Sequence, residues 1–400
     1  MRTLAALILG LAACGLLIIP LNQQTADHSD TLDFANFYTA GKIVVTGQAN
    51  HLYDVQLQQR IERQASPGGP FQPYYHPPFE ALLFAPFAWV SYPHAFLLWA
   101  GLNLVVFGVL VYLINRSGTR LSATRYMVWL GLCLFFVIGC LALGQDALLL
   151  APIFLLAFLV TKQRRDFSAG LALGLGLFRF EIVLPFVFIL LLRRRWRLFA
   201  GFCAMGLVAL GTSVALVGWS GMVRYLETLV VVGGSGKNVW ADQGYAQMMP
   251  SLYGAFHGLF GGLLLHSLSF PLVFVATFLV LIWAAVGFKH IGRPHEPAFG
   301  LEFSLACVAT LLASYDLFLS ELTLLIVVAL FVLAYEERHP SGGFFGKWSG
   351  TALLLLVPAV AAGGALVHSQ AFCVLAVVLL GMMLWLSQEI SASWTRSSGP

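Results

Sequence analysis

The chain has 400 residues, of which 59% are hydrophobic and only 10% are charged, and its formal net charge is +4. Soluble domains carry about 25% charged residues, so this composition excludes an ordinary soluble domain and indicates a polytopic membrane protein. The basic residues lie in short clusters between apolar stretches, which orients the chain in a bilayer and gives no indication of nucleic-acid binding. We therefore predict an all-α membrane protein with about twelve transmembrane helices.

The chain begins with Met1-Arg2 and an apolar stretch at residues 4–20. A cleaved signal peptide or a lipoprotein leader ending at Cys14 is the alternative to a first membrane helix. The apolar residues continue past Cys14, which favours a retained helix with a cytoplasmic N-terminus. Residues 21–90 are then an outer loop, in which apolar spacing predicts surface helices at 32–45 and 53–64.

The remaining membrane helices lie within residues 91–388, with a cytoplasmic tail at 389–400. Only 27 residues separate the basic clusters at 162–165 and 193–197. Two full spans need about 40 residues, whereas one span would place four arginines outside. We therefore predict two short helices, 167–178 and 182–192, with their junction below the outer surface. Residues 219–250 are predicted as a second outer loop, and no internal repeat divides this single membrane domain of residues 1–400.

With the basic clusters in the cytosol, the conspicuous polar motifs all lie on the opposite side of the membrane. Asp33 precedes Phe37 and Tyr38 on one predicted helical face. An acidic residue beside aromatic rings suits a general base acting on a sugar hydroxyl, because rings stack on sugars while the carboxylate takes the proton. The alternative is a helix N-cap, which these residues alone favour.

Other polar residues on this side are candidates with equally plain structural alternatives. Two prolines after His76 fix the direction of a turn that is either part of the site or a membrane-entry turn. Arg179 at membrane depth either binds a phosphate or pairs with Glu181. The predicted substrate-cavity residues are Phe37, Tyr38, Tyr75, Gln145, Asp146, Glu181, Asp316 and Glu321. The alternatives are a tight turn at 144–146 and a structural hydrogen bond at Glu321.

Several common functional motifs are missing from the sequence. It contains no P-loop, no dinucleotide fingerprint, no zinc-type histidine pair and no Gly-x-Ser-x-Gly elbow. A nucleotide-driven pump is therefore not expected, and we predict no cofactor. A divalent metal is compatible with the sequence but is not required by any part of it.

Several short motifs lie along residues 30–330, most of them in the first 70 of these. They are Asp33-Phe34-x-x-Phe37-x-x-Ala40-Gly41, Leu52-Tyr53-Asp54, Tyr75-His76-Pro77-Pro78-Phe79, Ala85-Pro86-Phe87, Gly144-Gln145 and Met249-Pro250-Ser251-Leu252-Tyr253. Together they resemble glycosyltransferase family 87, a family of multi-spanning enzymes of the GT-C class. The family includes enzymes similar to bacterial polyprenyl-phosphomannose-dependent mannosyltransferases.

The resemblance implies a sugar donor on polyprenyl phosphate and a glycolipid or glycan acceptor outside the bacterial cytoplasmic membrane. Membrane lipids are then partners and nucleic acid is not. In the inverting displacement that we expect, Asp33 is the catalytic base, and Arg179 and His76 bind the donor phosphate. The chain departs from the family pattern at 179–181, where Lys-Pro is common, and at 320–321, where Tyr-Asp is common. A lipid-linked sugar flippase and a non-catalytic envelope assembly partner are the two alternatives.

Overall fold

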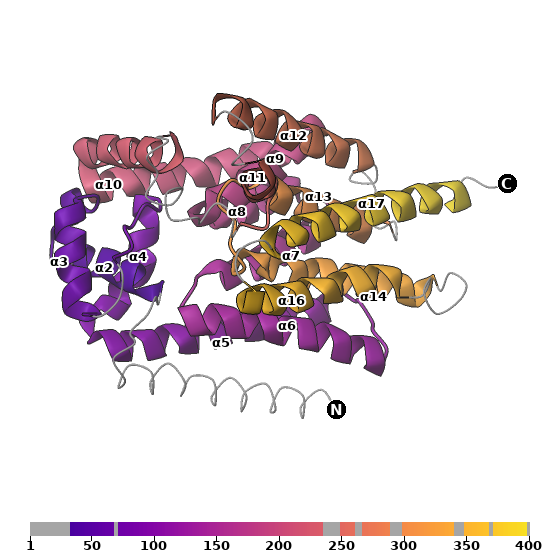
Figure 1. The fold of residues 1–400 in the computed structure, drawn as a ribbon, viewed down its shortest axis with the longest axis horizontal. Helices are drawn as coiled ribbons and strands as arrows, with labels where there is room; N and C mark the ends of the chain where they lie inside the picture. Colours follow the sequence, from indigo (N-terminus) through magenta and orange to yellow (C-terminus); the bar gives the residue numbers. More distant parts are fainter. Residues whose placement is uncertain are drawn as a thin grey trace. The chain divides into compact units, whose positions relative to one another are not determined.

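The computed structural model describes residues 33–67, 71–234, 249–260, 266–288, 298–339, 348–367 and 371–397. Helices joined by short turns make up these ranges, and no β-strand occurs in them (Figure 1). The prediction of an all-α protein is therefore confirmed. The predicted first membrane helix at 4–20 lies outside the described residues.

Several of these helices are apolar enough to cross a membrane. Five apolar helical segments in the described ranges also have the length of a span: Tyr92–Arg116, Ala123–Leu143, Trp196–Val231, Cys373–Ser393 and Asp166–Leu192, the last of which is interrupted by a 3₁₀ segment. Shorter apolar helices occur at Ala147–Lys162, Pro271–Gly287, Phe299–Ala313 and Ser349–Ala362. An integral membrane protein follows from these lengths and compositions, whereas the total of about twelve spans stays a prediction.

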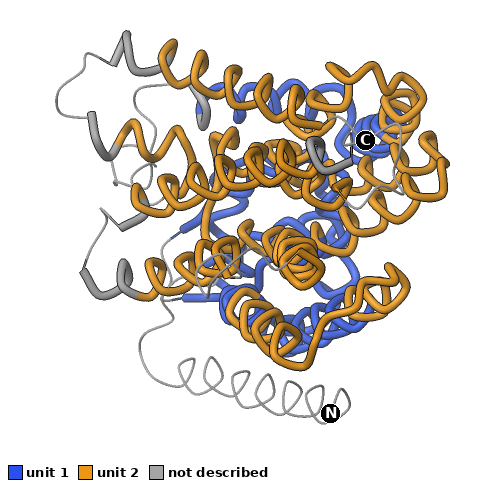
Figure 2. Tube along the Cα trace, turned by 90° about the vertical axis from the view of Figure 1, so that its right-hand side faces the viewer, with its two compact units in different colours: residues 1–109, 137–149, 206–238 blue, residues 110–136, 150–205, 239–400 orange. Residues whose placement is uncertain are grey.

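The chain forms two compact units, coloured separately in Figure 2. Unit 1 comprises residues 1–109, 137–149 and 206–238. Unit 2 comprises residues 110–136, 150–205 and 239–400.

Unit 1 has helices at both positions predicted in the first outer loop, α2 (Phe34–Val45) and α3 (Val55–Ala65). Their predicted place at the membrane surface stays a prediction. Helix α2 is buried on almost every side, because it packs against α4 (Ala81–Phe84) and the aromatic residues around it. A Cβ atom at Gly41 would lie 2.6 Å from the carbonyl oxygen of Phe84, so only glycine allows this close approach.

The predicted pair of short helices in unit 2 is also present. Helix α8 (Asp166–Gly174) and helix α9 (Phe180–Leu192) are joined by a 3₁₀ segment, Leu175–Arg179. The guanidinium of Arg195 donates to both carboxylate oxygens of Asp166 at 2.7 Å. A straight helix of this length would separate these ends by about 40 Å. The chain therefore doubles back at the junction, as the length argument predicted.

Helix α10 (Trp196–Gly234) is longer than predicted. Its backbone kinks at Gly218, with φ of 69°, and then continues as helix through the first half of the region predicted as the second outer loop. Residues 219–234 are therefore helical, which corrects that part of the prediction. Glycine permits the left-handed backbone at the kink, and the apolar residues on both sides support helix. Residues 389–397 of the predicted tail are likewise helical, because α17 (Ala371–Ser397) includes them.

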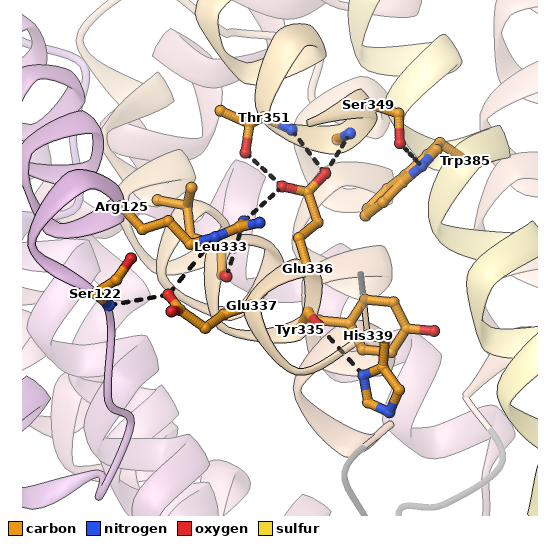
Figure 3. Close-up of polar contacts among 11 residues, drawn as sticks. Ser122, Arg125, Leu333, Tyr335, Glu336, Glu337, His339, Ser349, Thr351 and Trp385 are labelled. Atoms are coloured by element: carbon orange, nitrogen blue, oxygen red, sulfur yellow. Dashed lines mark hydrogen bonds and ion pairs between the residues drawn. The ribbon is translucent and has the colours of Figure 1, made fainter. Parts of the chain in front are cut away.

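A buried charge network joins three further helices of unit 2 (Figure 3). Arg125 of α6 (Ala123–Leu143) donates to Glu336 at 3.0 Å, and its guanidinium lies 4.5 Å from the centre of the Trp348 ring. Glu336 belongs to α14 (Leu325–Arg338) and is buried. Contacts to a carboxylate and an aromatic ring offset the desolvation of the arginine.

The same carboxylate caps the start of α16 (Ser349–Val367). Glu336 accepts the backbone N–H groups of Gly350 and Thr351 at 2.7 and 3.2 Å and the hydroxyl of Thr351 at 2.5 Å. These N–H groups have no partner inside their own helix, so the anion satisfies them and favours the helix dipole. One glutamate thus fixes α6, α14 and α16 together.

Candidate active site

Asp33 stands at the N-cap position of α2 but does not cap the helix. Its carboxylate instead accepts a hydrogen bond of 2.5 Å from the side-chain amide of Gln145, which is 112 residues away in the sequence. Asp54 makes the contrast clear, because at the start of α3 it accepts from the backbone of Gln56 and Leu57. The N-cap interpretation of Asp33 is therefore wrong, and the structure brings two predicted site residues together.

The turn that carries Gln145 is held rigidly against α2. Gly144 has φ of +71°, and a Cβ atom there would lie 2.5 Å from the Cβ of Phe34. The indole of Trp99 donates to the carbonyl of Gly144 at 2.8 Å. Only glycine permits this conformation in this space, which confirms the tight-turn interpretation of residues 144–146. The substrate-cavity role of Gln145 and Asp146 stays a prediction.

Asp146, the next residue, is completely buried in unit 1. Asp146 interacts electrostatically with Tyr74. Burial raises the pKa of the Tyr74 phenol, and the nearby carboxylates of Glu80 and Asp146 raise it further. The phenol thus stays a neutral donor, and it donates to the carbonyl of Pro77 at 3.1 Å. Asp146 therefore lies in the polar interior that surrounds the predicted turn.

His76 is buried in the same unit, between aromatic rings. Its ring centre lies 5.2 Å from that of Phe37 and 4.9 Å from that of Tyr75, with the Tyr75 ring stacked at 18°. Phe37 follows Asp33 by one helical turn, so the aromatic side of α2 connects Asp33 with His76. Tyr38, by contrast, points its hydroxyl at the carbonyl of Val90, at 2.9 Å.

Glu80 is a residue that sequence reasoning missed. Its carboxylate lies 3.2 Å from Nδ1 of His76, and both side chains are buried. When His76 is protonated, this contact is an ion pair that restricts the orientation of the ring. The spacing of four residues across the Pro77-Pro78 turn was the available signal, because residues four apart meet on a helical turn.

The turn before His76 is anchored by α3 and the loop preceding it. Gln58 accepts the backbone N–H of Tyr74 at 2.9 Å and donates to the carbonyl of Leu52 at 2.7 Å. Tyr53 donates to the carbonyl of His76 at 2.6 Å. Burial raises the pKa of Tyr53 well above its ordinary value, so this hydroxyl stays protonated and keeps its bond.

Glu62 gives this loop a dependence on pH. Burial raises the pKa of its carboxyl from 4.5 to about 7, although a hydrogen bond from the backbone N–H of Gln72 lowers it in part. The folded state therefore prefers the protonated form. The protonated carboxyl of Glu62 therefore makes its full contribution to the free energy of unfolding below pH 4.5. That contribution falls by roughly 3 kcal/mol in all as the pH rises to 7.

We expect the thermal unfolding midpoint to fall between pH 4.5 and 7 for this reason. Glu62→Gln should remove that part of the pH dependence, because the amide stays neutral throughout. Glu227→Gln, at an exposed carboxyl of the same unit, is the matched control and should leave the profile unchanged. An unchanged profile in Glu62→Gln would contradict the assignment.

A second polar cluster lies inside unit 2, at the junction of the α8–α9 hairpin. Nη1 of Arg179 lies 3.4 Å from Glu321 and 3.9 Å from Glu181, and all three side chains are buried. Glu321 also accepts from the backbone N–H of Phe318 at 2.6 Å and from the hydroxyl of Ser320 at 2.9 Å. The predicted alternative of an internal ion pair is therefore present, and its shorter contact is to Glu321.

Asp316 completes the acidic surroundings of this cluster. It lies near enough to Glu181 and Tyr253 to interact with both electrostatically. The ring of Phe180, between Arg179 and Glu181, lies 6.5 Å from that of Tyr315. The guanidinium of Arg179 thus lies in a cluster that contains the carboxyl groups of Glu181, Asp316 and Glu321.

Neither cluster has the geometry of a metal site. Among the described residues, no group of three His, Cys, Asp or Glu side chains is arranged to hold an ion. Carboxylates, a guanidinium and an imidazole are the titratable and charged groups that these clusters contain.

The model of glycosyltransferase family 87 matches residues 74–314, which is more than half of the chain. This chain belongs to glycosyltransferase family 87. Membership indicates glycosyl transfer between a sugar donor and an acceptor. Neither the curated proteins nor the solved structures gave a match.

The family 87 match covers part of the two clusters. His76, Glu80, Gln145 and Arg179 lie inside the matched residues, whereas Asp33 lies before them and Glu321 after them. The match is thus shorter than the resemblance over residues 30–330. The contact between Asp33 and Gln145 nevertheless ties the residue outside the match to one inside it.

Proposed function

We propose that this family 87 protein is a GT-C-type hexosyltransferase, similar to mannosyltransferases. It takes its sugar from a polyprenyl-phosphate donor. The acceptor is a glycolipid or glycan on the outer side of a bacterial cytoplasmic membrane. Its many apolar helices suit a donor that remains in the bilayer. The observation that carries the proposal is the bond from Gln145 that turns the carboxylate of Asp33 away from its helix.

Asp33 is the proposed general base. The carboxylate is half-buried, next to the buried rings of α2, and Gln145 holds it in one direction. It removes the proton of an acceptor hydroxyl while that oxygen attacks the anomeric carbon of the donor sugar. A new carbon–oxygen bond forms as the bond to the phosphate oxygen breaks, so the configuration inverts. The proton stays on Asp33, and polyprenyl phosphate leaves with the bonding electrons.

The leaving phosphate needs positive charge more than it needs a proton. Arg179 supplies a planar guanidinium with five N–H donors, suited to phosphate oxygens. Its contacts to Glu321 and Glu181 hold it in place and offset its burial. His76, oriented by Glu80, is the second proposed phosphate contact.

The donor class can be tested with the purified full chain in proteoliposomes. We expect transfer of radiolabel from polyprenyl-phosphate sugars to an envelope lipid extract, and none from the corresponding nucleotide sugars. Mannose, glucose and galactose donors compared side by side would identify the sugar. Transfer from nucleotide sugars alone, or movement of the lipid donor between leaflets without transfer, would overturn the proposal.

A further inference from the structure

Two turns of unit 2 share an unusual backbone conformation. One turn follows α7 (Leu150–Lys162) and the other follows α9. In each, a backbone N–H donates to the carbonyl five residues earlier: Arg165 to Val160 at 3.2 Å, and Arg195 to Leu190 at 3.1 Å. Arg164 and Arg194, the residues before these amides, have φ of 58° and 56°. Glycine is the usual residue at this position, because side chains there are strained. Both turns carry an arginine against that preference.

The two turns are fixed to one another. Arg195 at the end of one turn donates to both carboxylate oxygens of Asp166 at the end of the other. Just beyond them, a Cβ atom at Gly201 would lie 2.0 Å from the carbonyl oxygen of Phe167, so α8 and α10 are in backbone contact. The cations of both turns are therefore gathered at one end of these helices.

Most of these cations have no anionic partner. Among the described residues, no carboxylate lies within ion-pair distance of any of the five other arginines of the turns. These are Arg164, Arg165, Arg193, Arg194 and Arg197. The Nε atom of Arg193 is buried and has no hydrogen-bond partner. Helix α10 begins beside them with no acidic residue in its first turn, so its N-terminal N–H groups also favour an anion.

An apolar groove of about 480 Å³ adjoins the second turn. Its volume is within the range of pockets that hold one small ligand. It is formed by α9, by the start of α10 and by α12 (His266–Gly287), labelled in Figure 1. Its lining residues include Leu184, Leu191, Phe199, Phe202, Thr277 and Phe278. Leu191 and Phe199 lie two residues before Arg193 and two residues after Arg197, so groove and arginines are continuous.

We propose that this groove and the adjoining arginines form a binding site for one anionic glycerophospholipid. An acyl chain occupies the groove, and the phosphodiester lies against Arg193, Arg194, Arg197 and the start of α10. Guanidinium groups bind phosphate oxygens with two N–H donors each, and unpaired cations select a headgroup with net negative charge. Trp196 is 62% exposed within the turn, as expected of a residue at the membrane interface. This site is separate from the residues proposed for glycosyl transfer.

The test is lipid binding by the detergent-solubilised full chain, measured by native mass spectrometry with matched dioleoyl lipids. We expect phosphatidylglycerol to bind more tightly than phosphatidylcholine. The triple variant Arg193→Gln, Arg194→Gly, Arg197→Gln should lose roughly fivefold in phosphatidylglycerol affinity for each charge, or about 100-fold in all. Arg194→Gly relieves the strained backbone, so that substitution alone should weaken binding without lowering the thermal unfolding midpoint.

The matched control removes the same charge from other exposed positions, as Arg60→Gln, Arg63→Gln and Arg120→Gln. It should bind phosphatidylglycerol as the wild type does. Thr277→Phe, which fills the groove, should weaken both lipids while leaving the arginines in place. Glycerol 1-phosphate, which has no acyl chain, should bind far more weakly than the lipid.

Three results would overturn the proposal. The first is equal affinity for the two lipids, and the second is an equal loss in the control and in the triple variant. The third is binding of glycerol 1-phosphate as tight as that of the lipid, which would indicate a site for free phosphate.

Discussion

Asp33→Asn should lower the rate of glycosyl transfer by about 10²- to 10⁴-fold, the usual contribution of a general base. Asparagine has the same shape and still accepts the hydrogen bond from Gln145, so the fold should be kept. Only the ability to take a proton is lost. The measurement is the initial rate at saturating donor and acceptor, with the thermal unfolding midpoint as a check on folding.

The matched control is Asp54→Asn at the start of the neighbouring helix α3. Asp54 caps its helix and Asp33 does not, so the control changes the same chemical group at an equivalent helix position. We expect it to cost at most about 1 kcal/mol of stability and to leave the rate unchanged. The rate of glycosyl transfer by Gln145→Leu should lie between the rates of Asp33→Asn and Asp54→Asn. In this variant the carboxylate of Asp33 remains but loses the hydrogen bond that directs it. A fully active Asp33→Asn would refute the assignment of the base.

Arg179→Gln should lower the free energy of unfolding by about 3–5 kcal/mol, because it leaves Glu321 and Glu181 buried without their cation. The double variant Arg179→Gln, Glu321→Gln should recover part of that loss, since one of the stranded charges is removed with its partner. The thermal unfolding midpoints of the single and double variants measure the coupling.

The same pair of variants separates the structural role of Arg179 from phosphate binding. If the guanidinium binds the donor phosphate, the double variant stays inactive, or has a strongly raised KM for the donor, even where stability returns. Arg179→Lys keeps the charge but loses the planar fork, so it should retain stability better than it retains activity. Recovery of activity together with stability in the double variant would show that Arg179 is only structural.

The folded-back hairpin at 166–192 was predictable from sequence, because it follows from the number of residues between two basic clusters. The distance between two basic clusters was too short for two spans, and the charges excluded one span. The kinked continuation of α10 beyond Gly218 could not be predicted in the same way. Glycine and tryptophan at a predicted membrane surface read equally well as a loop, and the kink depends on a single backbone angle.

The site shows the same division. Asp33, His76, Gln145 and Arg179 were all candidates by residue type and by their place between apolar stretches. Sequence reasoning nevertheless favoured a cap for Asp33, because the local pattern of an acidic residue before a helix fits that role. In the structure, the side-chain amide of Gln145, far away in the chain, donates a hydrogen bond to this carboxylate instead.

The sequence by itself determined that the protein is helical, that it is built for a membrane and which polar residues stand out. Hydrophobic spacing and charge asymmetry are properties of neighbouring residues, so they are readable without a fold. Only the tertiary structure decided the partners: Gln145 for Asp33, Glu80 for His76 and Glu321 for Arg179. Which distant polar groups meet depends on the packing of whole helices, because each buried charge must find the one compensating group that the fold brings within reach.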